Sequence, residues 1–427
     1  MTTEATRSGT NPDTAERFSE QDIERSRSLV GVYHATTQRE HFTVASEDVI
    51  HNFARGYGDD NPLYTDAGYG ATTRWGSLIA PPMIGIAVNK QLMADPIPKD
   101  QRRPAFRGIH AFVSGSNTTF YAPVYPGDAL YQFQGFENVE VKESEFAGRS
   151  VIITRAHVRM NQRGQVVSVS RVIVIHTERH EAKGRNKYAD IEPARYTEDD
   201  IAAIDAIYEA ETRRGPQKRY WEDVNVGETT GTTAKGPLTI TDMLVFHAGG
   251  YGFTPYAPSA SRLGYLNRKR IKAFYVPNEY GVPDVAQRVH WDNDWAKSVG
   301  VPMAYDYGML RDCWLTHHLT NWMGDDGWLV QHSSQMRKFN YVGDTHLITG
   351  EVTGKRVEDG QHLVDITLRG ASQRGEVTCP AEATVALPSR ESGAIELPSV
   401  PTDVSQAAVS ILSRHGELLK ASPTLIR

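Results

Sequence analysis

The side chains best suited to proton chemistry in this 427-residue chain stand in three short strings. The strings are GDDNPLYTD at 58–66, with Asp59, Asn61 and Tyr64; HWDNDWA at 290–296, with His290; and AYDYG at 304–308, with Asp306 and Gly308. Carboxylates and imidazoles are the residue types that most often act as general acids and bases. By themselves, Asp, Asn and Pro in the first string predict only a turn.

Other familiar catalytic and binding motifs do not occur in the sequence. It contains no P-loop, no Gly-x-Gly-x-x-Gly opening a helix, no Gly-x-Ser-x-Gly elbow and no His-Glu-x-x-His. Cys313 and Cys379 are the two cysteines, too few for a disulfide framework or a zinc cluster. His290, Asp292 and Asp294 alternate along a helix start and do not converge on one ion, so we expect no metal site.

Four strings recur in the same order in the two halves of the chain, which indicates an internal repeat. DVIHNFARGYG at 48–58 matches DMLVFHAGGYG at 242–252, and FYAPVYPGD at 120–128 matches FNYVGD at 339–344. Two shorter pairs lie between them, and the second half carries about 32 extra residues. We expect this insertion, residues 253–289, to be functional, because a long insertion in a compact repeat is seldom structural.

Each half shows the same order of predicted elements. A short strand is followed by an acidic helix start, with N-caps at Ser46-Glu47-Asp48 and at Thr241-Asp242. A longer helix is expected at 83–93 in the first half and at 308–323 in the second, followed by alternating strands such as 149–160 and 346–357. The pattern predicts an α+β fold.

The predicted organisation is two repeats joined by a charged linker. We place the first repeat at 20–180, the linker at 181–219 and the second repeat at 220–390. The linker contains an amphipathic helix that starts at Thr197. Residues 1–18 and the last 35 or so read as peripheral arms.

The first string resembles the motif of the MaoC-like hydratase/dehydratase family of double-hotdog proteins, Gly-Asp-x-Asn-Pro-Ile/Leu-His followed by x-Asp. The resemblance covers roughly residues 25–180 and 220–390 and is more specific for the fold than for the activity. The matching positions are Gly58, Asp59, Asn61, Pro62, Leu63, Asp66, Gly76, Ile79, Ala80, Phe120, Pro123, Val124, Gly127 and Asp128.

The resemblance implies a double hotdog, in which each repeat wraps an antiparallel sheet around one long central helix. It also implies a hydro-lyase that adds water to a 2-enoyl thioester or removes it from a 3-hydroxyacyl thioester, with (R) stereochemistry. Coenzyme A is then part of the substrate, and no cofactor or metal is needed. The hotdog fold also hosts acyl-CoA thioesterases, and a non-catalytic hotdog partner subunit is a third reading.

The sequence departs from the family motif in both repeats. Tyr64 stands at the family's His position, whereas His290 holds that position in the second repeat, where Phe253 replaces the Asp. In similar two-domain proteins the catalytic pair lies in the second repeat. We therefore predict His290 as catalytic, with Asp284 as the nearest preceding acid.

The remaining candidates are predicted to bind substrate: Asp59, Asn61, Tyr64, Asp306 and Gly308. The backbone N–H of Gly308 at a helix start is expected to face the thioester oxygen. Asp59 and Asn61 are alternatively helix-entry residues, and Asp306 alternatively bonds its own loop. The adjacent His317 and His318 lie on the long second helix, where we expect a buried, hydrogen-bonded role.

The composition and charge of the chain disfavour several classes of protein. The formal charge of −6, with no basic block, disfavours a nucleic-acid partner. No run of about 18 apolar residues occurs, which disfavours a membrane protein. The polar start of the chain has no signal-peptide pattern. We expect a cytoplasmic protein that acts on an acyl-CoA and forms a homo-oligomer, most simply a homodimer.

Overall fold

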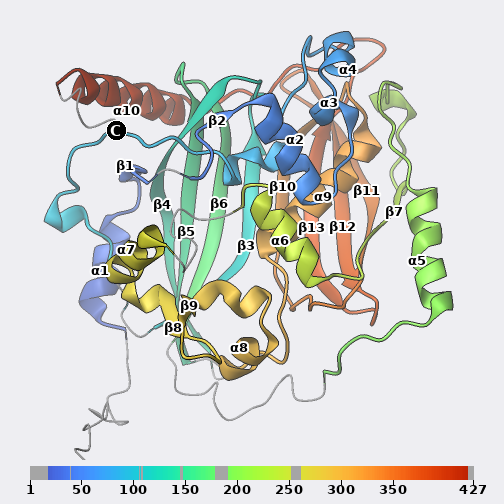
Figure 1. Cartoon of the computed structure of the whole chain (residues 1–427). Helices are drawn as coiled ribbons and strands as arrows, with labels where there is room; N and C mark the ends of the chain where they lie inside the picture. The colour runs from blue at the N-terminus through green and yellow to red at the C-terminus, as the bar shows by residue number, and fades with distance from the viewer. Residues whose placement is uncertain are drawn as a thin grey trace, which may run out of the picture.

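The strands form one long antiparallel sheet. The computed structural model describes residues 18–421, apart from 39, 105, 107–108, 145–147, 178–190 and 252–260. Within these residues the sheet has 11 strands in the order β1-β4-β5-β6-β3-β10-β13-β12-β11-β7, and β2 pairs with β4 (Figure 1). The bounds are β1 Tyr33–Ala35, β2 Val44–Ala45, β3 His110–Phe120, β4 Asp128–Ser144, β5 Gly148–Asn161, β6 Val166–Thr177, β7 Thr229–Lys235, β10 Trp328–Gln335, β11 His346–Glu358, β12 Gln361–Ser372 and β13 Val377–Ala386.

Two blocks of the same internal order form the middle of this sheet, with β1 and β2 paired to one outer strand and β7 to the other. The first is β4-β5-β6-β3 and the second is β11-β12-β13-β10. They join where β3 runs antiparallel to β10, with Asn117 opposite Ser333. The two predicted repeats are therefore halves of a continuous sheet, and the predicted α+β double hotdog is confirmed.

The central helix of the second repeat, α9, spans Gly308–Met323 as predicted. It is buried on every side, so its polar side chains need partners inside the fold. His318 is hydrogen-bonded to Thr230 and Thr233 of β7. The Asp312 carboxylate accepts hydrogen bonds from Ser116 of β3 and Ser334 of β10, directly under the seam between the repeats.

The first repeat has no matching long helix, and the prediction of a helix over 83–93 is wrong. Only a 3-10 turn, η1 (Pro82–Ile86), forms there. The chain then extends, and Val88 and Lys90 form bridges with Phe42 and Tyr131. The carbonyl of Gly85 accepts from Arg159 Nε at 2.7 Å. The bridges and the bond from Arg159 use backbone groups that a longer helix would have paired within itself.

Each repeat has a short helix that begins with acidic residues, and these two helices cross at a pair of glycines. Helix α2 (Glu47–Gly56) is capped by Ser46 as predicted. Helix α6 (Ile240–Ala248) is capped by Thr239, two residues before the predicted Thr241, because Asp242 completes a capping box with Thr239. A Cβ on Gly249 would lie 2.9 Å from the Cα of Gly56, so the crossing requires glycine.

The remaining helices lie around the sheet. Helix α5 (Glu198–Ala210) is the predicted linker helix, capped by Thr197. Helix α10 (Thr402–Ala421) packs on an apolar cluster of the first repeat through Val404 and Ala408 (Figure 1). No helix among the described residues is long and apolar enough to cross a membrane.

The first residues of the predicted insertion, 253–260, lie outside the described part of the chain. From residue 261 onward the insertion has secondary structure of its own. Its elements, with the short helix that follows, are α7 Arg262–Arg270, η5 Lys272–Phe274, β8 Tyr275–Pro277, β9 Pro283–Val285, η6 Ala286–His290 and α8 Asn293–Ser298.

Candidate active site

The predicted site residues fall into two groups at different levels of α9. Asp59, Asn61 and Tyr64 face the C-terminal half of this helix, where His317 and Thr320 lie. The other group, with His290, surrounds the start of the helix. Gly308 and His317 are nine residues apart on one helix, about 13 Å at 1.5 Å per residue. The two groups are therefore separate places in the fold.

The loop after α2 fixes Asp59 by local hydrogen bonds. Gly58 has φ +77°, a conformation that glycine adopts without strain, and it turns the chain inward. The Asp59 carboxylate then accepts from the Asn61 backbone N–H at 3.0 Å and from the Tyr57 hydroxyl at 2.9 Å. Asn61 caps the short helix α3 (Pro62–Thr65) by accepting from Leu63 N–H. Asp59 is 3% exposed.

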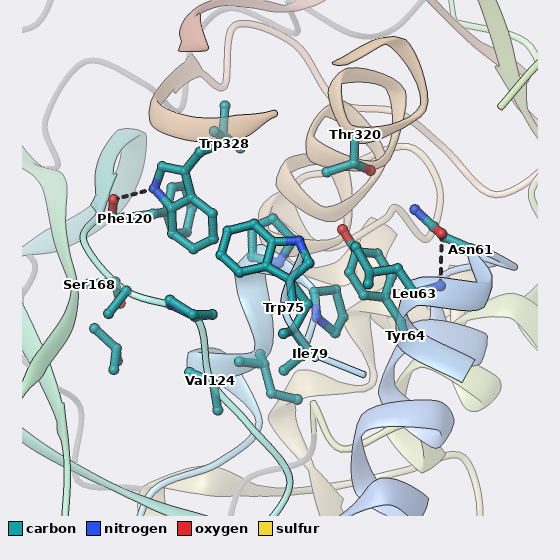
Figure 2. Close-up of a pocket in the computed structure, with 18 of the residues that line it drawn as sticks. Asn61, Leu63, Tyr64, Trp75, Ile79, Phe120, Val124, Ser168, Thr320 and Trp328 are labelled. Atoms are coloured by element: carbon teal, nitrogen blue, oxygen red, sulfur yellow. Dashed lines mark hydrogen bonds between the residues drawn. The ribbon is translucent and has the colours of Figure 1, made fainter. Parts of the chain in front are cut away.

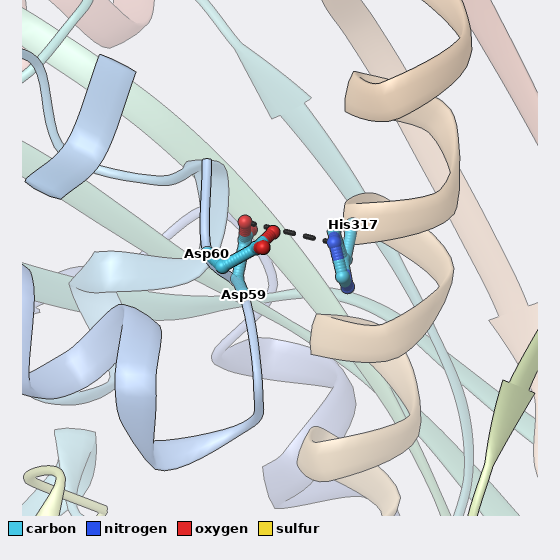
Figure 3. Close-up of side chains that lie close together, drawn as sticks. All are labelled: Asp59, Asp60 and His317. Atoms are coloured by element: carbon cyan, nitrogen blue, oxygen red, sulfur yellow. Dashed lines mark ion pairs between the residues drawn. The ribbon is translucent and has the colours of Figure 1, made fainter. Parts of the chain in front are cut away.

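His317 of the opposite repeat faces this carboxylate, as Figure 3 shows. Its Nε2 lies 3.6 Å from Asp59 Oδ1 and 3.7 Å from Oε1 of Glu211, the residue that ends the linker helix. Asn321, one turn further along α9, lies 3.0 Å from the same nitrogen. Lys235 Nζ is 2.8 Å from the other ring nitrogen, Nδ1. An imidazole thus stands between a buried cation and two acids.

Burial is the largest cause of the pKa shifts in this group. It raises the pKa of Asp59 to about 6, although the Asn61 N–H, the Tyr57 hydroxyl and Lys235 act in the opposite direction. Burial, together with Lys235, holds the pKa of His317 well below its usual value, so this imidazole is neutral at pH 7. Burial also lowers the pKa of Lys235. Asp59 therefore titrates close to neutral pH, where a proton-transferring group works best.

An apolar pocket adjoins this group (Figure 2). Asn61, Tyr64 and Thr320 lie on one side of it, and Phe120, Ser168 and Trp328 on the other. Tyr64 is hydrogen-bonded to Thr320, three residues after His317 on α9. The empty space of the pocket, open mouth included, is about 660 Å³. Asn61 and Thr320, which line the pocket, lie two and three residues after Asp59 and His317 in the sequence.

His290 lies in a cluster of aromatic rings beside the start of α9. Its Nδ1 is 2.8 Å from the carbonyl oxygen of Tyr305, and its ring centroid lies 3.8 Å from that of Tyr307. The Tyr307 hydroxyl is hydrogen-bonded to His247. Burial lowers the pKa of His290 to about 4. The imidazole is neutral at pH 7, and the rings around it are those of Tyr305, Tyr307 and, through Tyr307, His247.

The acids predicted to act with His290 have other contacts. Asp306 is buried in an ion pair with Arg311, and Asn340 also donates to its carboxylate at 3.0 Å. Asp284 lies in the β8–β9 hairpin, where its carboxylate accepts from its neighbour's N–H. Within the described residues, no hydrogen bond or ion pair joins Asp284 to His290. The pairing of these two residues stays a prediction, and the geometry of Asp306 favours a structural role.

His317 was expected to be structural, and neither Lys235 nor Glu211 was among the predicted site residues. One signal for His317 was available, because 317, 320 and 321 are polar positions on one face of a helix that is otherwise core. Lys235 ends a strand and Glu211 ends a linker helix, so neither carries a motif. Only the packing of these elements against α9 brings them to the site.

Asp59, Asp60 and His317 each offer a ligand atom within 4.8 Å of the others. A divalent cation prefers several anionic or carbonyl ligands. Here Lys235 is hydrogen-bonded to His317, and Arg213 pairs with Asp60 at 2.8 Å. These two cations oppose a third positive charge, so the group fits proton transfer better than metal binding.

An acid and an imidazole from opposite repeats thus lie beside an apolar pocket on a double hotdog. Residues 28–169 match the family model of the FAS1-like dehydratase domain region. No curated protein matches the chain. A solved structure described as a MaoC-like dehydratase aligns with 84% of this chain and 99% of its own length, at 15% identity and a TM-score of 0.56.

Two other solved structures are more distant. The double-hotdog protein Rv0216 of Mycobacterium tuberculosis aligns with 83% of this chain and 95% of its own, at 11% identity and a TM-score of 0.45. The (R)-hydratase from A. caviae aligns with 39% of this chain and 99% of its own, at 18% identity and a TM-score of 0.29. The predicted resemblance is confirmed: the first repeat matches the FAS1-like dehydratase model, and the fold over most of the chain is similar to that of a solved MaoC-like dehydratase.

Proposed function

We propose that this protein adds water to a 2-enoyl thioester, or removes it from a 3-hydroxyacyl thioester, with Asp59 and His317 as the acid–base pair. One observation carries the proposal: a buried acid and a buried imidazole from opposite repeats meet beside an apolar pocket. The match of residues 28–169 to a dehydratase domain supports the reaction class. Coenzyme A as the carrier and a homodimer as the assembly belong to the same proposal.

The spacing of the pair suits a shared water molecule. At 3.6 Å, Asp59 Oδ1 and His317 Nε2 are too far apart for a strong direct hydrogen bond, whereas one water lying to the side of both atoms is able to hydrogen-bond to each. In hydration, one of the two groups takes a proton from the water as its oxygen bonds to C3. A proton is then delivered to C2, so the pair gains and loses no net proton.

The assay follows two signals with a series of trans-2-enoyl-CoA esters of increasing chain length. Loss of the enone absorbance without thiol release supports hydration. Thiol release supports the thioesterase alternative, which the fold permits. No change of either signal across the series contradicts both activities and supports a non-catalytic partner role.

Substitution of each histidine in turn tests which imidazole takes part in catalysis. We expect His317→Ala and Asp59→Asn each to lower kcat by about 10²-fold or more, because general acid–base groups contribute on that scale. His318→Ala is the matched control, because it removes a neighbouring buried imidazole that is bonded to threonines. If His290→Ala abolishes hydration and His317→Ala does not, the site lies with His290, as the family motif implies.

A further inference from the structure

Helix α7 in the insertion reverses the usual arrangement of a surface helix, because it turns its apolar side chains outward. Its buried residues are Gly264 and Asn267. Leu263, Tyr265 and Leu266 are 58%, 44% and 41% exposed. A surface helix normally buries its apolar stripe, and exposed apolar side chains that lie together mark a surface to which a partner binds.

The same helix carries cations and no acid. Arg262, Arg268, Lys269 and Arg270 lie on it, and within the described residues none of them forms an ion pair with a carboxylate. Helix stability explains cations in the last turn, but the helix dipole disfavours a positive charge in the first turn, where Arg262 lies. The surface of α7 therefore fits a partner that is anionic and partly apolar.

Helix α5 has the complementary surface. Ile204 is the buried residue of this 13-residue helix, and Ile201 is 37% exposed. Acids occur along its whole length, and it has no cation. Asp205 and Glu209 lie beyond the first turn, where the helix dipole no longer favours acids. Among the residues that the structure describes, neither of these two carboxylates is in an ion pair.

The two helices present charged and uncharged side chains at the same spacing. Positions i, i+3, i+4 and i+7 lie on one face of a helix. Antiparallel packing would place Lys269 on Glu198 and Arg262 on Asp205, because each pair of charges is about 10 Å apart along its helix. The outer two positions are charged, the inner two are uncharged and all are exposed: Arg262, Tyr265, Leu266 and Lys269 in α7, and Glu198, Ile201, Ala202 and Asp205 in α5.

We propose that α7 of one copy of this chain packs antiparallel on α5 of a second copy. In Figure 1 the two helices lie on opposite sides of the molecule, so α7 does not reach α5 of its own chain. A two-fold axis makes the contact twice and closes the dimer. Helix α6 lies between the two in Figure 1, and its exposed Ile240, Leu244 and Val245 add apolar surface to the interface.

The inference names the surface of the homodimer in the proposed function, and sedimentation velocity tests it apart from any assay of hydration. We expect a wild-type dimer whose dissociation constant rises with salt, because salt screens exposed charges. Arg262→Glu/Lys269→Glu should raise that constant about tenfold or more, since it places acids against acids. Lys420→Glu is the matched control, because Lys420 is also an exposed lysine in the last turn of a helix.

Mixing two variants tests the pairing of the helices. Glu198→Lys/Asp205→Lys should also weaken self-association, but an equimolar mixture with the α7 variant has opposite charges at both contacts. We expect the mixture to dimerise about tenfold or more tightly than either variant alone.

A folded pair of variants that dimerises no better when mixed overturns the proposal, as does an α7 variant that dimerises like wild type. If a variant fails to fold, a wild-type dimer that salt does not weaken overturns it as well. An active but monomeric wild type overturns this inference and leaves the proposed reaction intact.

Discussion

His317 Nε2 lies 3.6 Å from Asp59 Oδ1, although the two residues belong to opposite repeats of the chain. Asp59 sits in a loop that its own hydrogen bonds hold in place. His317 sits on the one long helix at the centre of the fold. Because α9 is buried on all sides, the imidazole has little freedom to leave the acid.

The pH dependence of stability tests the burial of Asp59. Its pKa is about 6 in the folded protein against 3.8 for the free group, so the native state binds the proton more tightly. Above about pH 6 the buried charge therefore costs stability, and this cost is progressively relieved as the pH falls from about 6 to about 4. Asp59→Asn should remove the dependence and raise the free energy of unfolding at pH 8 by about 1–3 kcal/mol.

Urea unfolding at several pH values measures this effect. The quantity to compare is the difference between wild type and Asp59→Asn, because the other titrating groups then cancel. Curves that stay parallel between pH 4 and pH 8 would show that Asp59 is not desolvated in the native state.

The charge of Lys235 should influence the pH dependence of kcat/KM. Its ammonium group lowers the pKa of both Asp59 and His317. Replacing it by Met removes that charge, so both pKa values rise and the acid limb of kcat/KM moves to higher pH. Lys235→Arg keeps the charge and should leave the limb closer to wild type. A profile of Lys235→Met that superimposes on wild type argues against this coupling.

The crossing of α2 and α6 should tolerate no side chain. In Gly249→Ala the new Cβ would lie 2.9 Å from Gly56 Cα and 3.1 Å from Asn52 O, both backbone atoms. We expect a loss of about 1–3 kcal/mol in the free energy of unfolding. Gly416→Ala in α10 is the control, because nothing lies within 4 Å of its Cβ position, and a gain of about 0.5–1 kcal/mol is expected there.

Helix α10 should stabilise the first repeat through its inner face. Ala408 is fully buried against the apolar cluster of that repeat, whereas its neighbour Val409 is 60% exposed. Ala408→Asp should lower the free energy of unfolding by about 2 kcal/mol or more, because it buries a carboxylate without a partner. Val409→Asp should change it by less than about 0.5 kcal/mol. Equal effects of the two substitutions would mean that α10 does not pack here.

Local sequence signals predicted the elements well where the hydrogen bonds are local. Ser46 and Thr197 cap their helices as expected, and strands such as 346–357 follow the alternation of apolar and polar residues. The expected helix at 83–93 failed because Arg159, distant in sequence, takes up the Gly85 carbonyl. The spacing of apolar residues along the sequence does not predict a contact between segments so far apart.

By itself the sequence determined the repeat, the α+β class and the motif loop around Asp59, since these depend on spacing and on short-range hydrogen bonds. It also pointed to an imidazole partner, and it named His290. Tertiary structure alone decided which groups meet. His317 lies beside Asp59, and Lys235 and Glu211 lie beside His317, because α9, β7 and the linker helix converge near one loop. Such convergence depends on packing between distant segments, which no local pattern encodes.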